Sequence, residues 1–381
     1  MEWLSLEVGG KRGCSESDGH QRKGYMLERI SGSLARTLSR SSFVTTPPSK
    51  PLPFGMELLP AGRMACFGPR HPDKVFYVIW RERHGVGFFS NASQILCHLI
   101  IADSLGMEPV VDLENFPTLY NEDEEVCGTR NAWEYYFKQT SSVPLREVYE
   151  SQHVFFCDGK FPSGFSYYAS EIPESQGIFD RFVTVRPDIE DSVNEWMAGF
   201  GPRTLGVHFR GQEQNRAAGH PFAPTERQIL DATARLIRER NFDRIFLVTE
   251  DQRYLDLFRN EFGSLVWATD SFRTRGENAY RMRPRPLHRY LLGREVLVDA
   301  LLLSRCQALV ASWSNVSEFA KLMNCGKYEV VWSIWNGRNS RNPLLALYQY
   351  GLRKRLPPTL GGLPGQILET GAGASRGHPD V

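Results

Sequence analysis

Short blocks of hydrophobic residues alternate with polar ones along the chain, and each block predicts one element of an α/β fold. Residues 74–80 form a continuous apolar run typical of a buried strand, and a polar, glycine-containing loop follows them. Residues 92–105 carry apolar side chains at helical spacing, and residues 107–113 again resemble a strand. A strand, loop, helix and strand in this order predict a parallel βαβ unit.

The second half of the chain repeats this alternation more clearly. Its apolar runs predict strands at 205–209, 244–249, 265–268, 308–311 and 329–332. The stretches between them predict helices at 225–240, 252–262, 295–306 and 317–323, and a further helix over 188–200 precedes the first of these strands. We therefore expect a second parallel sheet in this half.

Length and composition are consistent with two domains. The chain has 381 residues, of which 41% are hydrophobic, and this suits about two domains of roughly 150 residues each. Residues 1–70 are rich in Gly, Ser, Arg and Pro and predict a disordered or non-native leader. We expect Rossmann-like domains over 71–200 and 201–350, and a flexible tail over 351–381.

The charge balance excludes several classes of partner. The formal net charge is +1, from 45 basic and 44 acidic residues, so no global field attracts nucleic acid or an anionic membrane. No apolar run is long enough to span a membrane or to act as a signal core, which predicts a cytoplasmic chain without a transmembrane segment. Nine of the 45 basic residues are lysines, so arginine must supply most contacts to anions.

Polar side chains follow three predicted strands of the second half, at the point where each strand ends. His208 and Arg210 end the first, residues 249–251 (TED) follow the next, and residues 312–315 (SWSN) follow the fourth. Because the carboxyl ends of parallel strands meet at one edge of a sheet, we expect these residues to line one crevice. Arg210 can hold a phosphate through two parallel N–H bonds, so this edge is predicted to bind the diphosphate of a sugar nucleotide.

Helix capping is the alternative role for several of these residues. Asp251, Ser314 and Asn315 are ordinary N-cap types, although a hydroxyl-rich turn before a helix also suits a phosphate. Asp299, on the helix before the fourth strand, has apolar neighbours and can accept paired N–H bonds from a guanine edge or pair with an arginine. Glu213, just after Arg210, is either a catalytic base or a solvated loop acid.

Three stretches resemble motifs of one enzyme family. Residues 206–211 (GVHFRG) resemble the first motif, H-x-R, of the fucosyltransferase superfamily, which has α1,6-, α1,2- and protein O-linked branches. Residues 299–315 resemble its later motif, in which an Asp opens a helix that leads to an apolar strand and a Ser/Thr-rich phosphate loop. Residues 248–251 resemble the acidic strand end between the two, and the first βαβ unit is similar to the amino-terminal domain of the nodulation fucosyltransferases.

This resemblance implies a GT-B fold, with two Rossmann-like domains facing each other across a donor cleft, the C-terminal one binding the nucleotide sugar. It implies an inverting, metal-free transfer of fucose from GDP-fucose to a glycan or protein hydroxyl, without a cofactor. The chain contains no Asp-x-Asp to hold a divalent ion. The donor-binding residues it implies are His208, Arg210, Gly211, Asp251, Asp299, Ser312, Ser314 and Asn315. Arg210 would bind the β-phosphate and stabilise the departing GDP, and Asp299 would recognise the guanine base.

The chain departs from the family directly after Arg210. Members of the α1,6 branch carry a second arginine where Gly211 stands, and their Thr-Asp-Lys is replaced by Gln-Glu-Gln at 212–214. Glu213 is then the nearest carboxylate that could deprotonate an acceptor hydroxyl. Two other functions stay open: a non-catalytic nucleotide- or glycan-binding relative, and a GT-B transferase that uses another sugar nucleotide.

Two stretches are candidates for the walls of the acceptor site. The basic insertion at 273–289 follows the third strand of the second half. Aromatic residues at 133–137 (WEYYF) are either a sugar-stacking surface or a short element packed on the first domain. The sequence does not identify the acceptor.

Overall fold

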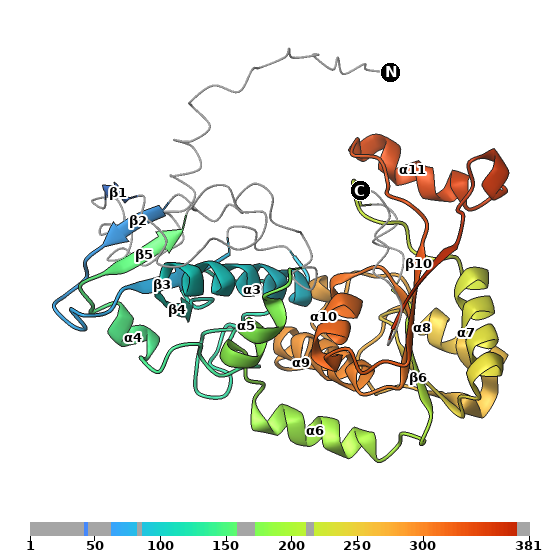
Figure 1. Cartoon of the computed structure of the whole chain (residues 1–381), viewed down its shortest axis with the longest axis horizontal. Helices are drawn as coiled ribbons and strands as arrows, with labels where there is room; N and C mark the ends of the chain where they lie inside the picture. Colours follow the sequence, from blue (N-terminus) through green and yellow to red (C-terminus); the bar gives the residue numbers. More distant parts are fainter. Residues whose placement is uncertain (1–41, 45–61, 82–85, 158–171, 211–216, 372–381) are drawn as a thin grey trace, which may run out of the picture.

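The computed structural model describes residues 42–44, 62–81, 86–157, 172–210 and 217–371, and it contains two sheets. Figure 1 shows the five-stranded sheet at one end of the long axis and the six-stranded sheet at the other, with α9 (His288–Ser304) and α10 (Asn315–Asn324) between them. The predicted α/β class with parallel strands is confirmed. The predicted arrangement of two domains facing across a donor cleft stays a prediction.

The first sheet is built around the predicted βαβ unit. Its order is β1 (Ser42–Val44), β2 (Gly62–Ala65), β5 (Val154–Cys157), β3 (Phe76–Ile79) and β4 (Glu108–Val111). The central β3 pairs in parallel with β4 and β5, and β2 and β1 continue the sheet in antiparallel pairings. The connecting helix α3 (Phe88–Leu105) ends at Gly106, whose φ of 67° is a conformation that glycine adopts without strain.

The second sheet has the predicted parallel strands in the order β10 (Val330–Trp335), β9 (Ala308–Ser312), β6 (Thr204–His208), β7 (Arg244–Val248) and β8 (Val266–Trp267). From β6 the chain moves to β7 and β8 on one side, and it then returns to β9 on the other side of β6. This reversal makes the β6–β9 boundary a topological switch point, and open α/β sheets bind ligands beyond the carboxyl ends of the strands at such a point.

The helices of the second half follow the predicted alternation. The predicted helices are α7 (Glu226–Arg240), α8 (Gln252–Phe262), α9 and α10, whereas α11 (Pro343–Arg353) was not predicted. Short 3-10 turns lie at η3 (Gly263–Leu265), η4 (Ala279–Arg281) and η5 (Pro358–Leu360). Thr225 and Gln228 close α7 with reciprocal side-chain-to-backbone bonds, as a capping box does. On the first sheet's side lie α4 (Leu145–Val148) and α5 (Ser175–Phe182), and α6 (Pro187–Met197) matches the helix predicted over 188–200.

Several elements differ from the sequence predictions. The strands β2 and β11 (Gln366–Thr370) lie in the stretches predicted as leader and flexible tail, and β11 pairs antiparallel with β10. β5 was not predicted, because four apolar residues without alternation do not distinguish a strand from other buried segments. α9 begins at His288, seven residues before the predicted start at Glu295, so the end of the basic insertion is helical.

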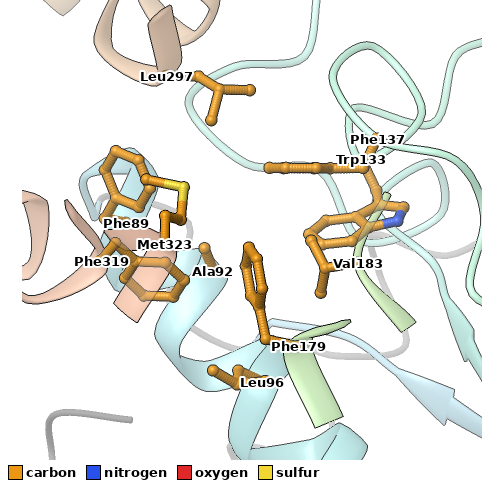
Figure 2. A pocket seen from close by; sticks show the side chains of 10 residues that line it. All are labelled: Phe89, Ala92, Leu96, Trp133, Phe137, Phe179, Val183, Leu297, Phe319 and Met323. Atoms are coloured by element: carbon orange, nitrogen blue, oxygen red, sulfur yellow. The ribbon is translucent and has the colours of Figure 1, made fainter. Parts of the chain in front are cut away.

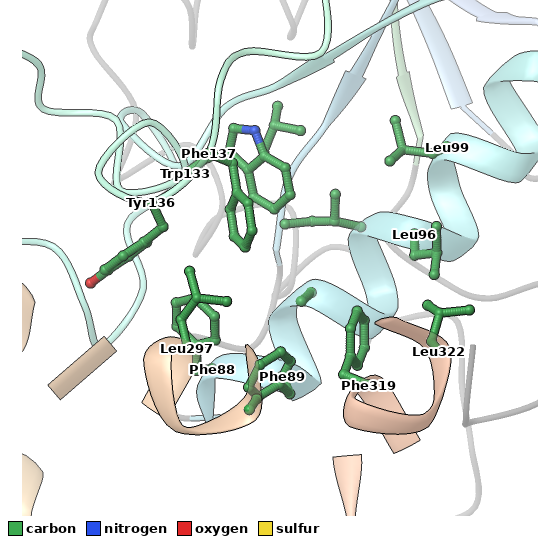
Figure 3. Packing of buried hydrophobic residues seen from close by; sticks show 14 of the residues in the cluster. Phe88, Phe89, Leu96, Leu99, Trp133, Tyr136, Phe137, Leu297, Phe319 and Leu322 are labelled. Atoms are coloured by element: carbon green, nitrogen blue, oxygen red, sulfur yellow. The ribbon is translucent and has the colours of Figure 1, made fainter. Parts of the chain in front are cut away.

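A layer of aromatic and aliphatic side chains joins the elements between the two sheets, and we call it the aromatic layer. Figure 3 shows its members pointing toward one another from α3, the 133–137 segment, α9 and α10: Phe88, Phe89, Leu96, Leu99, Trp133, Tyr136, Phe137, Leu297, Phe319 and Leu322. The Phe89 and Phe319 rings lie 4.9 Å apart, and those of Trp133 and Phe137 stack at 4.3 Å. The layer is one continuous core that contains residues from both halves of the chain.

The aromatic layer overturns one predicted site. The rings of residues 133–137 are buried in it, so they do not form an exposed sugar-stacking surface. Figure 2 shows a small pocket inside the layer, lined by Phe89, Ala92, Leu96, Trp133, Phe137, Phe179, Val183, Leu297, Phe319 and Met323. Because no charged side chain lines this pocket, it is unsuited to a diphosphate.

Within the described residues, no helix combines the length and the apolar character needed to cross a membrane.

A substitution at Gly293 of α9 tests whether the aromatic layer holds the two halves of the chain together. A Cβ at this position would overlap the Tyr136 hydroxyl oxygen and lie 3.0 Å from the Tyr120 ring. We expect Gly293→Ala to lower the free energy of unfolding by about 1–3 kcal/mol in urea denaturation, because the buried rings have no room to move. In Gly177→Ala, on α5, the added Cβ meets nothing within 4 Å, so this control should be neutral or slightly stabilising. Equal effects of the two substitutions would contradict tight packing at α9.

Candidate functional site

The carboxyl end of β6 is fixed by a serine from the neighbouring strand. The Ser312 hydroxyl, at the end of β9, donates to the His208 carbonyl oxygen at 3.2 Å and accepts from the Arg210 backbone N–H at 3.3 Å. On the other side, the Phe209 N–H donates to the carbonyl oxygen of Val248 on β7. The backbone that carries Arg210 is therefore held from both neighbouring strands at the switch point.

His208 lies at this edge as a buried, neutral imidazole. Burial and, to a smaller extent, the positive charge of Arg210 lower its pKa to about 3, against a smaller opposing effect from Ser312. Its Nδ1 lies 3.4 Å from the Ser314 hydroxyl oxygen. His208 therefore carries no charge at neutral pH, and it supports the strand end rather than supplying a cation to an anion.

Arg210 supplies the cation at this edge. Among the described residues, its half-buried guanidinium has no hydrogen bond or ion pair, although its backbone is fixed by Ser312. Burial lowers the pKa of His220, and the positive charges of Arg210 and Arg338 lower it further. Arg210 and Arg338 thus act on the same imidazole, and neither forms an ion pair with a carboxylate of the described residues, an arrangement that suits a polyanion.

Asp299 lies in a second polar cluster, together with Thr269, Ser271 and Arg273. Its carboxylate accepts from the hydroxyls of Thr269 at 2.6 Å and Ser271 at 3.1 Å. Burial raises its pKa to about 6, and the Thr269 hydroxyl and the Arg273 charge oppose that rise. Asp299 is therefore a buried acid that titrates close to neutrality.

Arg273 connects this second cluster to the strand ends. Its Nε donates to the carbonyl oxygen of Thr249, directly after β7, at 3.1 Å, and its Nη1 donates to the carbonyl oxygens of Thr269 and Ser271. Its Nη2 is buried and has no hydrogen-bond partner among the described residues. A buried donor left open in this way costs about 1–3 kcal/mol, and a ligand atom could satisfy it.

Two of the predicted donor-binding side chains act as helix caps. Asp251 caps α8 by accepting from the Arg253 backbone N–H at 2.9 Å, and it also forms an ion pair with the Arg253 guanidinium. Ser314 caps α10 in a reciprocal arrangement with Ser317. The capping alternative drawn from the sequence therefore describes both residues. Asn315, the first residue of α10, differs because its Oδ1 is buried and unpartnered.

The remaining predicted residues, Gly211 and Glu213, lie outside the described residues. In the part of the chain that the structure covers, no three His, Cys, Asp or Glu side chains are grouped as metal ligands would be. Metal independence and the catalytic base stay predictions.

Sequence reasoning missed Arg338, His220 and the specific role of Arg273. Arg338 follows β10 at an isolated bridge with Pro221, and its guanidinium lies 5.9 Å from the Trp335 ring. Only the topology, which places β10 next to β9, brings this arginine toward the β6 end. Both arginines follow a predicted strand, and this position could have marked them as candidate site residues. From the sequence, Arg273 was instead assigned to the acceptor wall, and Arg338 was not singled out.

Of the comparisons with known proteins, only the one with solved structures finds similar proteins. No protein-family model matches the chain, and no curated protein matches it. NodZ alpha-1,6-fucosyltransferase co-crystallised with GDP is similar at 16% identity and a TM-score of 0.46, over 69% of this chain and 96% of NodZ. POFUT1 in complex with GDP is similar at 13% identity and a TM-score of 0.32, over 68% of this chain and 73% of POFUT1.

Both similarities are weak in sequence and in fold. Their identities and TM-scores are too low to carry a substrate or a site residue over to this chain.

The raised pKa of Asp299 predicts a specific pH dependence of stability. The native state holds this proton more tightly than the unfolded chain, whose Asp pKa is 3.8, so stability falls as pH rises from about 4 to above 6. Relative to Asp299→Asn, which cannot titrate, the wild type should lose about 3 kcal/mol over this window, measured by urea denaturation at each pH. A difference between the two proteins that stays constant with pH would contradict the buried-acid assignment.

Proposed function

We propose that this protein transfers fucose from GDP-fucose to a hydroxyl of a glycan or protein acceptor. The supporting observation is the Arg210 guanidinium, which has no hydrogen bond or ion pair among the described residues and stands at the switch point on a backbone fixed by Ser312. A fixed cation at this edge can bind a diphosphate in the ground state. It stabilises the additional negative charge that develops on GDP as the sugar leaves.

In the proposed reaction the acceptor hydroxyl oxygen attacks the anomeric carbon of fucose as the bond from that carbon to the β-phosphate oxygen breaks. GDP leaves with the bonding electron pair, and the hydroxyl proton passes to a base. Attack from the side opposite GDP inverts the configuration at the anomeric carbon. Glu213 is the proposed base, from its sequence position three residues after Arg210.

Arg338 is a candidate for the second cation that the α1,6 branch places directly after the first arginine. Gly211 leaves that position without a charge, but Arg338 acts on the same histidine, His220, as Arg210 does. A guanidinium from the end of β10 could then neutralise the diphosphate from the other side. The proposed site thus combines cations from two strand ends.

Asp299 is proposed to recognise the base of the nucleotide. A carboxylate can accept two parallel N–H bonds from the guanine edge, whereas uracil and adenine lack that paired donor pattern. Its hydroxyl partners, Thr269 and Ser271, hold it in place. Since the Asp299 pKa is about 6, the ionised form predominates at neutral pH and is available as an acceptor.

Isothermal titration with GDP tests the phosphate assignment. Wild type should bind GDP in the presence of a chelator, and Arg210→Ala should bind about tenfold to a hundredfold more weakly, because one charge-assisted contact contributes roughly 1.5–3 kcal/mol. Arg210→Lys should be intermediate, since lysine keeps the charge but loses the paired donors. Arg227→Ala, on the exposed face of α7, removes the same charge elsewhere and should bind as wild type does. Equal affinity of wild type and Arg210→Ala would contradict the proposal.

Donor hydrolysis separates an enzyme from a non-catalytic relative. An active protein should slowly release fucose from GDP-fucose when water replaces the acceptor, and Arg210→Ala should reduce that rate more than tenfold. Retained GDP binding without fucose release above the buffer rate would favour the binding protein. Stronger binding of UDP or ADP than of GDP would indicate a transferase with another nucleotide sugar.

A further inference from the structure

We propose that α11 and the residues beside it form a docking surface for an anionic lipid membrane. Figure 1 shows α11, in orange-red, at the edge of the molecule beyond β10. This surface, which we call the α11 surface, consists of Leu344, Leu345, Leu347, Tyr348, Leu352 and Leu360. The proposal does not depend on the fucosyltransferase assignment.

The apolar side chains of the α11 surface are exposed to an unusual degree. Leu344 is 72% exposed and Tyr348 76%, and the other four members are about half exposed or more. Among the described residues, the only other exposed large hydrophobic side chain is that of Leu287, at 40%. Exposed apolar side chains that gather on one short segment mark an interaction surface, whereas scattered ones do not.

The helix packs on the protein through the face that carries Ala346, Tyr350 and Arg353. Its buried residue is Ala346, and the Tyr350 ring lies 6.0 Å from the Phe222 ring beneath it. Arg353 points the same way and donates to the carbonyl oxygens of Gly361 and Gly362. Leu344 and Tyr348, four residues apart, therefore share the opposite, outward face. Burial in the protein core does not account for the leucines of α11.

The charges beside the α11 surface indicate the kind of partner. From Asn336 to Gly365 the sequence contains no Asp or Glu, whereas it contains Arg338, Arg341, Arg353, Lys354 and Arg355. Arg341, Lys354 and Arg355 form no ion pair with any described residue. Although the net charge of the whole chain is only +1, this segment presents basic groups around an apolar face.

An anionic lipid surface fits this combination better than a second copy of the chain. In a two-fold pair of α11 surfaces the same basic groups would meet each other without an acidic residue of the segment between them. At a membrane, the leucines and Tyr348 can enter the headgroup region while Lys354 and Arg355 reach anionic lipids. With 11 residues, α11 is too short to span the bilayer and would lie in its plane.

Vesicle flotation of the full chain tests the proposal. Wild type should float with vesicles of equal parts phosphatidylcholine and phosphatidylserine, and much less with phosphatidylcholine alone, and raised salt should weaken the binding. Leu344→Gln/Tyr348→Gln, and separately Lys354→Gln/Arg355→Gln, should each lower the partition coefficient by about tenfold or more. These side chains are exposed, so thermal unfolding should stay as in wild type.

The matched control is Arg146→Gln/Arg227→Gln, which removes the same two charges from exposed positions on α4 and α7 and should leave vesicle binding unchanged. Failure of wild type to bind either vesicle type would overturn the proposal. Binding that the control weakens as much as Lys354→Gln/Arg355→Gln would also overturn it, because it would reflect overall charge. Concentration-dependent dimerisation that Leu344→Gln/Tyr348→Gln abolishes, without vesicle binding, would assign the surface to a second copy.

Discussion

The aromatic layer is the constraint on which the arrangement of both sheets depends. α3 contributes to it from the first sheet's side, and α9 and α10 contribute from the second. Burial of rings is worth more per residue than any surface ion pair in this structure, because each ring removes a large apolar area from water. The strand ends that carry the polar residues are therefore attached to a core made from both halves of the chain.

Burial and charge give the residues of the candidate site different roles. His208 is held neutral by burial, so Arg210 keeps its charge without competition from a second cation at the same strand end. Asp299 is held by hydroxyls, which donate hydrogen bonds without neutralising its charge. Hydroxyl groups thus position both the backbone of Arg210 and the Asp299 carboxylate.

The sequence predicted the elements whose pattern is local. The apolar runs identified β3, β4 and β6, and the helical spacing identified α3 and α7, because burial of one face imposes these periods directly. Asp251 and Ser314 matched the capping alternative for the same reason, since a cap depends on residues within one turn.

Features that depend on distant residues were missed. The position of Arg338 relative to the end of β6 follows from the pairing of β10 with β9 and of β9 with β6, which no local pattern encodes. The 133–137 aromatics have the composition of a carbohydrate-binding surface, and only their packing against α3 and α9 shows that they are core residues. The exposed leucines of α11 have a helical pattern that would normally predict a buried face, and the direction in which that face points is a tertiary property.

The helix α9 carries both a close contact of the aromatic layer and a residue of the proposed site. Gly293 fits against Tyr136 in the aromatic layer, and Asp299 stands six residues later, about 9 Å along the same helix axis. A helix transmits displacement along its length because its backbone hydrogen bonds resist stretching. A shift of α9 at Gly293 would therefore also displace the Asp299 carboxylate.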